Sequence, residues 1–163
     1  MIDKRVAGVI LSISAILSVL IVVQAVEDYL LLIDAVSNIE TNISRVEISK
    51  FNEKVNVKIV FEIKAPGGRF EIEEILYVLY IEEEKGLERA YAGQEYCRIL
   101  MPENGSLKVV SQVEIYGKRA NWLWSRSREK NWVVYYKILI KTVMGTVSIS
   151  EQEKGSFIAV SYT

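Results

Sequence analysis

The chain has 163 residues, half of them hydrophobic, and its 20 basic and 21 acidic residues leave a formal net charge of −1. This near-neutral balance argues against nucleic acid as a partner, because nucleic-acid-binding proteins usually carry an excess of positive charge. There is no histidine and only one cysteine, Cys97, which excludes a Ser-His-Asp triad, a Cys-His nucleophile, a histidine-ligated zinc and a disulfide within the chain. These absences favour a non-enzymatic protein with no catalytic residue, no metal ligand and no cofactor.

An apolar segment near the N-terminus is the first element in chain order. Residues 6–26 contain no charged side chain, and their polar residues are Ser12, Ser14, Ser18 and Gln24. As a helix this segment spans about 31 Å at about 1.5 Å per residue, which matches the hydrocarbon core of a bilayer. The pattern predicts a transmembrane helix, and the membrane is therefore the first partner that we expect.

The charges beside this segment predict its orientation. Lys4 and Arg5 precede it, whereas Glu27 and Asp28 follow it. The positive-inside rule places the N-terminus in the cytoplasm and the rest of the chain outside it. The sequence thus predicts a single-pass protein of the cell membrane.

Two alternatives use the same segment differently. Val23-Gln24-Ala25 resembles the cleavage site of a secretory signal, although the apolar run exceeds the roughly 7–15 residues usual for such signals. A pilin-like or envelope protein would instead assemble through this helix. Gly8 and Ser12 form a pair of small residues that lets two helices approach closely.

The next residues predict a boundary. Residues 29–36 remain apolar except for Asp34, which favours an interfacial extension of the helix. Ser37 and Asn38 offer a helix end, and residues 39–44 are interpreted as a short polar linker. We therefore expect an anchor over residues 1–40 and an extracytoplasmic domain over residues 41–163.

From about residue 45 the apolar residues recur with a period of two, which is typical of strands buried on one face. The clearest run is Val55, Val57, Ile59, Phe61 and Ile63, and similar runs occupy residues 70–81, 107–115, 134–140, 147–149 and 157–162. Turn residues such as Pro66-Gly67-Gly68 and Asn104-Gly105 separate them. The pattern predicts an all-β, immunoglobulin- or fibronectin-III-like antiparallel β-sandwich.

Several segments of the domain follow the order of a known family. They are the alternating strand at 55–63, the turn at Pro66, the run Phe70 to Tyr80, Gly93, the segment Ile99-Leu100-Met101-Pro102 with Gly105, and the run from Tyr136 to Val147. Residues 46–151 thereby resemble the late-embryogenesis-abundant type-2 group, also called the water-stress and hypersensitive-response (WHy) domain. The family's usual Asn-Pro-Asn at the first turn is Ala65-Pro66-Gly67 here. The resemblance implies a sandwich without catalytic residues, linked to stress protection and to contact with lipid or protein surfaces.

The stretch Lys118–Trp132 departs from the strand pattern and combines aromatic with basic residues. Helical spacing places Ala120, Leu123, Trp124 and Ser127 on one side, which predicts a short helix closing one end of the sandwich. The alternative is a contact patch for headgroups, acidic glycans or a partner protein. This candidate patch consists of Trp122, Trp124, Arg126, Arg128 and Trp132.

Three further features have modest interpretations. Asn42 and Asn104 lie in glycosylation sequons on the predicted outer side. Cys97 is expected to be a small buried apolar residue, with an intermolecular disulfide as the alternative. The acidic residues at 71–74 and 82–84 are best explained as solvated strand and turn charges rather than as catalytic carboxylates or calcium ligands.

The sequence therefore favours a non-enzymatic, membrane-anchored sandwich that binds or shields a lipid or protein surface. A pilin-like or envelope component is the alternative, with an unknown envelope protein as partner. A hydrolase or transferase that uses carboxylates alone is the third hypothesis.

Overall fold

The computed structural model describes residues 4–65, 70–102, 104–142 and 145–161. A long helix, α1 (Lys4–Ser37), leads into a β-rich body that also contains one short helix, α2 (Gly117–Ser127). The strands are β1 (Glu40–Phe51), β2 (Lys54–Lys64), β3 (Glu71–Glu83), β4 (Gly86–Leu100), β5 (Ser106–Tyr116), β6 (Asn131–Thr142), β7 (Gly145–Ser156) and β8 (Ile158–Ser161).

The strands form two sheets packed face to face, which we call sheet A and sheet B. Sheet A has the order β5-β2-β1-β8 and sheet B the order β4-β3-β6-β7. Every pairing is antiparallel except that of β1 with the short β8. The β5-β2-β1 and β4-β3-β6-β7 orders are those of a fibronectin-III sandwich, so the predicted fold class is confirmed. The chain passes from β7 in one sheet to β8 in the other through Phe157.

The core between the sheets is built by the alternation visible in the sequence. Five alternating apolar residues of β2 are each at most 1% exposed: Val55, Val57, Ile59, Phe61 and Ile63. The ring of Phe61 packs at 5.6 Å from the rings of both Tyr77 and Tyr136. Packed side chains thus fill the space between the sheets.

Buried hydroxyl groups join the two sheets near this aromatic cluster. The Tyr77 hydroxyl lies 2.8 Å from Ser111 Oγ, and the Tyr136 hydroxyl lies 3.1 Å from Thr41 Oγ1. Burial raises the pKa of Tyr77, although the bond to Ser111 opposes that change. Burial also raises the pKa of Tyr136 to about 12. Each bond links sheet B to sheet A and so contributes to fixing their relative position.

The junction between α1 and β1 is short. The helix ends at Ser37, as predicted, and the Asn38 side chain donates a hydrogen bond to the Asp34 carbonyl at 2.9 Å. The prediction of a linker over residues 39–44 is wrong, because β1 begins at Glu40 and pairs with β2 from there. β8 pairs with β1 only from Glu47 to Lys50. Among the described residues, the first half of β1 is an edge without a strand beside it there, and its Ile43 amide donates a hydrogen bond to the Glu153 carboxylate at 2.9 Å.

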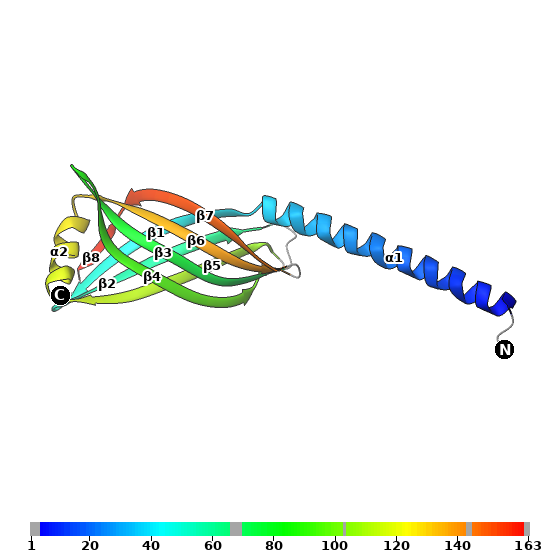
Figure 1. Cartoon of the computed structure of the whole chain (residues 1–163). Coiled ribbons are helices and arrows are strands. Elements are labelled where there is room, and N and C mark those ends of the chain that lie inside the picture. Colours follow the sequence, from blue (N-terminus) through cyan, green and yellow to red (C-terminus); the bar gives the residue numbers. More distant parts are fainter. Residues whose placement is uncertain (1–3, 66–69, 103, 143–144, 162–163) are drawn as a thin grey trace.

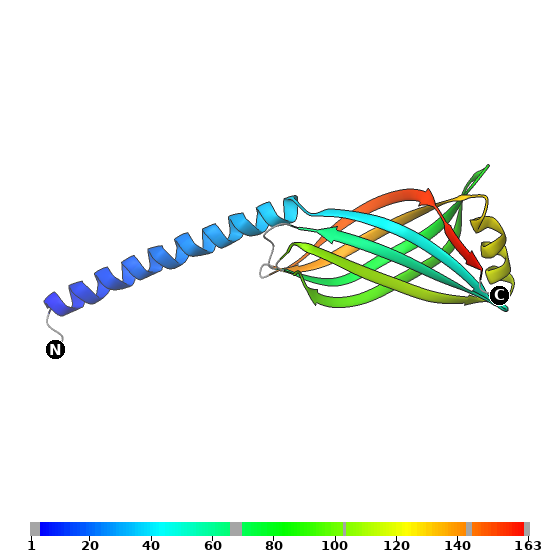
Figure 2. The ribbon, with the colours of Figure 1, turned by 180° about the vertical axis from the view of Figure 1, so that it is seen from behind.

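The two helices lie at opposite ends of the sandwich. Figure 1 shows α1 extending from one end, while α2 crosses the other end, and Figure 2 shows the same arrangement from behind. The described side chains between Gly8 and Leu31 are all exposed, so this part of α1 does not pack on the sandwich.

Candidate functional site

The helix α2 caps the end of the sandwich farthest from α1. Its Ala120, Leu123 and Ser127 are buried, as the helical spacing predicted. Trp122 and Trp124 are partly buried and pack against the core. The sequence therefore folds here into a cap whose inner side completes the core.

Trp132 belongs to this end but lies inside the sandwich at the start of β6. It is 4% exposed, and its indole N–H donates a hydrogen bond to the Ser156 carbonyl at 2.9 Å. A side chain at Gly155 would lie 2.6 Å from the indole ring, so glycine is required beside it. Trp132 is therefore a core residue and not a surface contact.

The basic residues of the cap have partners within the chain. Arg126 Nε and Lys130 Nζ each lie 3.6 Å from an oxygen of Glu83, and the Arg128 guanidinium lies 4.7 Å from the centre of the Trp124 ring. Arg126 and Lys130 thus help to hold this part of the chain on the end of β3, whereas Arg128 makes its contact within the cap. A binding role for Trp122, Trp124, Arg126 and Arg128 stays a prediction.

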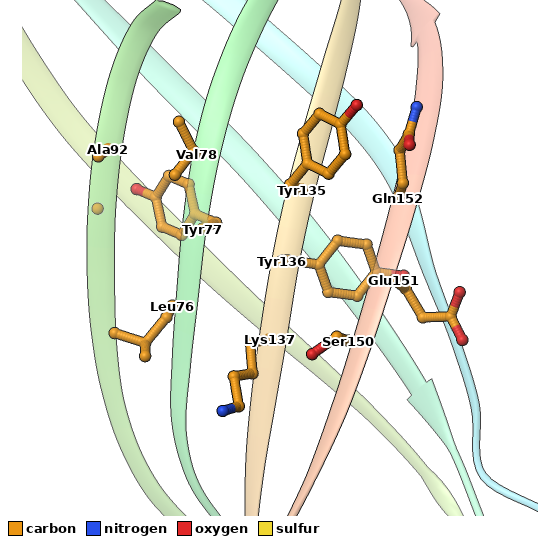
Figure 3. A pocket seen from close by; sticks show the side chains of 11 residues that line it. Leu76, Tyr77, Val78, Ala92, Tyr135, Tyr136, Lys137, Ser150, Glu151 and Gln152 are labelled. Atoms are coloured by element: carbon orange, nitrogen blue, oxygen red, sulfur yellow. The ribbon is translucent and has the colours of Figure 1, made fainter.

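A hollow on the outer face of sheet B is the second candidate site, and we call it the outer hollow. It has a volume of about 650 Å³ and is wide and shallow. Figure 3 shows that its side chains come from neighbouring strands, with Leu76 and Val78 on β3, Tyr135 and Lys137 on β6, and Gln152 on β7. Tyr135 is 40% exposed, and its ring packs edge-on against Tyr80 at 5.5 Å. The centre of this face is therefore apolar and aromatic.

The outer face of sheet A is different. Its strands present charged side chains to solvent, and two ion pairs cross them: Lys54 with Glu114 at 3.1 Å and Lys108 with Glu62 at 2.6 Å. A sandwich with both outer faces in water usually keeps both polar. The difference marks the outer face of sheet B as the candidate interface.

One pattern in the sequence indicates the outer hollow, although the alternation of buried residues alone does not reveal it. Residues 75–81 are apolar without interruption, so Leu76, Val78 and Tyr80 alternate with the buried residues of β3. A strand that is apolar on both faces is normally covered on both. That rule points to a partner for this face.

The predicted glycosylation sites both lie at the surface. Asn42 is exposed in β1, and Asn104 is exposed in the turn before β5, where its side-chain oxygen accepts a hydrogen bond from the Ser106 amide at 3.1 Å. Glycosylation at either position stays a prediction.

The environments of Cys97 and of the carboxylates do not favour a reactive thiol or a metal site. Burial, with the nearby Glu95 and Glu74, raises the pKa of the Cys97 thiol to about 11, which disfavours the reactive thiolate. Within the described ranges, no group of three or more Cys, Asp or Glu side chains is placed to hold a metal ion.

The chain resembles known proteins in structure rather than in sequence. No protein family and no curated protein sequence matches the chain. The solution structure of AT1g01470 from Arabidopsis thaliana has a TM-score of 0.57 at 14% identity, covering 76% of this chain and 83% of that one. The solution structure of At2g46140.1, described as a late embryogenesis abundant (LEA) protein, has a TM-score of 0.43 at 14% identity, covering 83% of this chain and 86% of that one.

A third match concerns a part of a larger enzyme. A β-glucuronidase of Bacteroides uniformis has a TM-score of 0.39 at 11% identity, covering 73% of this chain but 13% of that one. At 14% identity the likeness to AT1g01470 shows a shared fold.

Proposed function

We propose that this chain is a non-enzymatic, single-pass membrane protein that holds a water-stress-type β-sandwich outside the cytoplasm and binds a partner surface there. The observation that carries the proposal is that α1 is long, apolar and not buried within the chain. From Gly8 to Leu31 it is 24 residues long with a mean hydropathy of 2.7, and none of this stretch is buried within the chain. An apolar helix of that length needs a covering, which a bilayer supplies.

The sandwich supports the same proposal because it does not need α1. Its core is filled by side chains from both sheets, with the cap residues Ala120 and Leu123 at 0% exposure. A core helix of a soluble protein would pack into such a body, whereas the stretch of α1 from Gly8 to Leu31 is not buried against it. The helix therefore acts as an anchor.

The filled core argues against one kind of ligand, a single lipid molecule held between the sheets. A lipid carrier needs an interior cavity, which would take the place of packed residues such as Phe61 and Tyr136. Here the apolar surface available for contact lies on the outside of sheet B. This favours recognition of a protein surface over extraction of a single lipid molecule.

Membrane anchoring is tested by fractionating cells that express the full chain. We expect the protein in the membrane fraction, resistant to alkaline wash and released by mild detergent. An Ile16→Lys, Leu20→Lys variant places two charges in the middle of α1 and should shift the protein to the soluble fraction, whereas Ile16→Leu should not. Release of the parent protein by alkaline wash would contradict the proposal, and sedimentation as a filament after detergent would favour the pilin-like alternative.

The orientation is tested with a cysteine on the outer face of sheet A. Lys58→Cys, in a Cys97→Ala background, should react with a membrane-impermeant maleimide in intact cells as fully as in lysed cells. Reaction after lysis alone would place the sandwich in the cytoplasm and contradict the predicted topology.

A further inference from the structure

On the outer face of sheet B, acidic and basic side chains lie on two neighbouring strands beside the outer hollow. Glu71 and Glu74 lie on β3, whereas Lys137 and Lys141 lie on the neighbouring β6. Lys137 and Lys141 are exposed, and no ion-pair partner lies within 4.0 Å of either among the residues that the structure describes. Leu76 lies beside Lys137, and Val78, Tyr80 and Tyr135 lie between these charged groups and the far end of the sheet.

The strand register makes this pattern self-complementary. Glu71 pairs with Lys141 across the two strands, Leu76 with Lys137, and Val78 with Tyr135. A two-fold axis along the strands, between β3 and β6, would bring β3 of one copy over β6 of another at the same height. Acidic side chains would then face basic ones twice, and apolar side chains would meet between the copies, as a two-fold interface requires.

From this juxtaposition we propose that the occupant of the outer hollow is a second copy of this chain, packed sheet B to sheet B as a parallel dimer. The hollow is shallow and broad, which suits another flat sheet better than a small molecule. The Tyr135 ring and the Val78 side chain of each copy would lie at the centre of the interface, and Glu74 would lie within reach of the partner's lysines.

The geometry of anchoring agrees with this arrangement, and in that respect the inference rests on the proposed function. An axis along the strands keeps both α1 helices at the same end of the dimer, since α1 leaves each sandwich at one end (Figure 1). Two helices in one membrane would also be confined to a shared plane, which raises their effective concentration. The α1 helices would stand about 30 Å apart, because sheet layers pack about 10 Å apart, so Gly8 and Ser12 would not touch their counterparts.

The first test is thiol cross-linking of the full chain in detergent, in a Cys97→Ala background. Val78→Cys should give a cross-linked dimer with a bis-maleimide of about 10 Å, because the facing sheets lie about 10 Å apart, beyond the reach of a direct disulfide. Lys58→Cys, on the outer face of sheet A, and Gly8→Cys, in α1, are the matched controls and should stay monomeric. Absence of the dimer with Val78→Cys, or cross-linking confined to Gly8→Cys, would overturn the proposal.

The second test exchanges the charges. In the Val78→Cys background, one variant carries Glu71→Lys and Glu74→Lys, and the other carries Lys137→Glu and Lys141→Glu. Each alone should lose about tenfold in cross-linked dimer, because like charges then face each other. An equal mixture should recover it, since the lysines introduced on β3 of one variant then face the glutamates introduced on β6 of the other, and the two unaltered strands face each other with opposite charge.

Recovery in the mixture also shows that both variants are folded. If both variants dimerise as well alone as mixed, the sheet B interface is wrong. Because cross-linking is measured in detergent and anchoring by alkaline wash, failure of the dimer leaves the membrane proposal standing, and failure of anchoring leaves the dimer standing.

Discussion

At the residue scale, Gly93 determines how closely β4 approaches the ring of Tyr77. A Cβ atom at position 93 would lie 2.4 Å from the Tyr77 hydroxyl oxygen and 2.8 Å from the Tyr91 ring. Gly93→Ala should therefore displace the ring, weaken the 2.8 Å bond to Ser111 and cost about 1–3 kcal/mol of unfolding free energy. Urea denaturation of the variant and the parent protein measures the loss.

Gly93 also offers a matched test of the cause. Tyr77→Leu removes the ring that the new methyl group would strike, so Gly93→Ala should cost clearly less in the Tyr77→Leu background than in the parent. Equal costs in the two backgrounds would mean that the destabilisation arises from the β4 backbone rather than from this contact.

Tyr136 makes the stability of the sandwich depend on pH in the alkaline range. Its pKa is raised from 10.0 to about 12, so the folded state holds the phenol proton more tightly than the unfolded state does. Its contribution is fully present below pH 10 and is lost as the pH rises from about 10 to 12. Thermal melts across this range should show a falling Tm, and the fall should be smaller in Tyr136→Phe. An identical pH dependence in the two proteins would contradict this assignment.

At the scale of elements, strict alternation made some strands predictable. In β2 and β6 every second residue from Val55 to Ile63 and from Val134 to Ile140 is apolar and buried in the core, which gives the period of two. β4 was not identified because it is an edge strand with register shifts in its pairing with β3, and Arg98 has a φ of 47°. Bulges and exposed positions break the alternation on which the prediction depended.

The candidate sites show the same limit. The sequence identified the stretch that forms α2, since Trp and Arg residues stand out there. It did not separate Trp132, which is buried at the start of β6, from Trp122 on the helix. The outer hollow depends on which face of sheet B remains uncovered, and that follows from the sheet order rather than from the residues of one strand.

Residues of α2 have two different roles, packing against the core and contact at the surface, and single substitutions can distinguish them. Leu123 is fully buried, so Leu123→Ala should cost about 2–4 kcal/mol of unfolding free energy. Arg128 contacts the Trp124 ring at the surface, so Arg128→Ala should cost about 1 kcal/mol or less. Denaturation of the two variants measures both values. A cost for Arg128→Ala as large as that for Leu123→Ala would contradict the view that the inner side of α2 holds the cap in place.

At the scale of the whole molecule, the chain is an elongated rod with its helices at opposite ends (Figures 1 and 2). The strands of about a dozen residues make the sandwich about 40 Å long, at about 3.3 Å per residue. If α1 lies in the bilayer, the turn at Asn104 is near the membrane and α2 is far from it. A contact patch on α2 would then meet a partner away from the anchoring membrane rather than its headgroups.

This arrangement is measurable with a fluorophore on the full chain in vesicles whose headgroups carry a quencher. Asn104→Cys and Ser125→Cys, each in a Cys97→Ala background, place the label on exposed positions at the two ends of the sandwich. We expect quenching to be several-fold stronger at residue 104 than at residue 125, because quenching by contact falls off over a few ångströms. Equal quenching would show that the sandwich lies flat on the bilayer, and α2 would then be able to reach the headgroups.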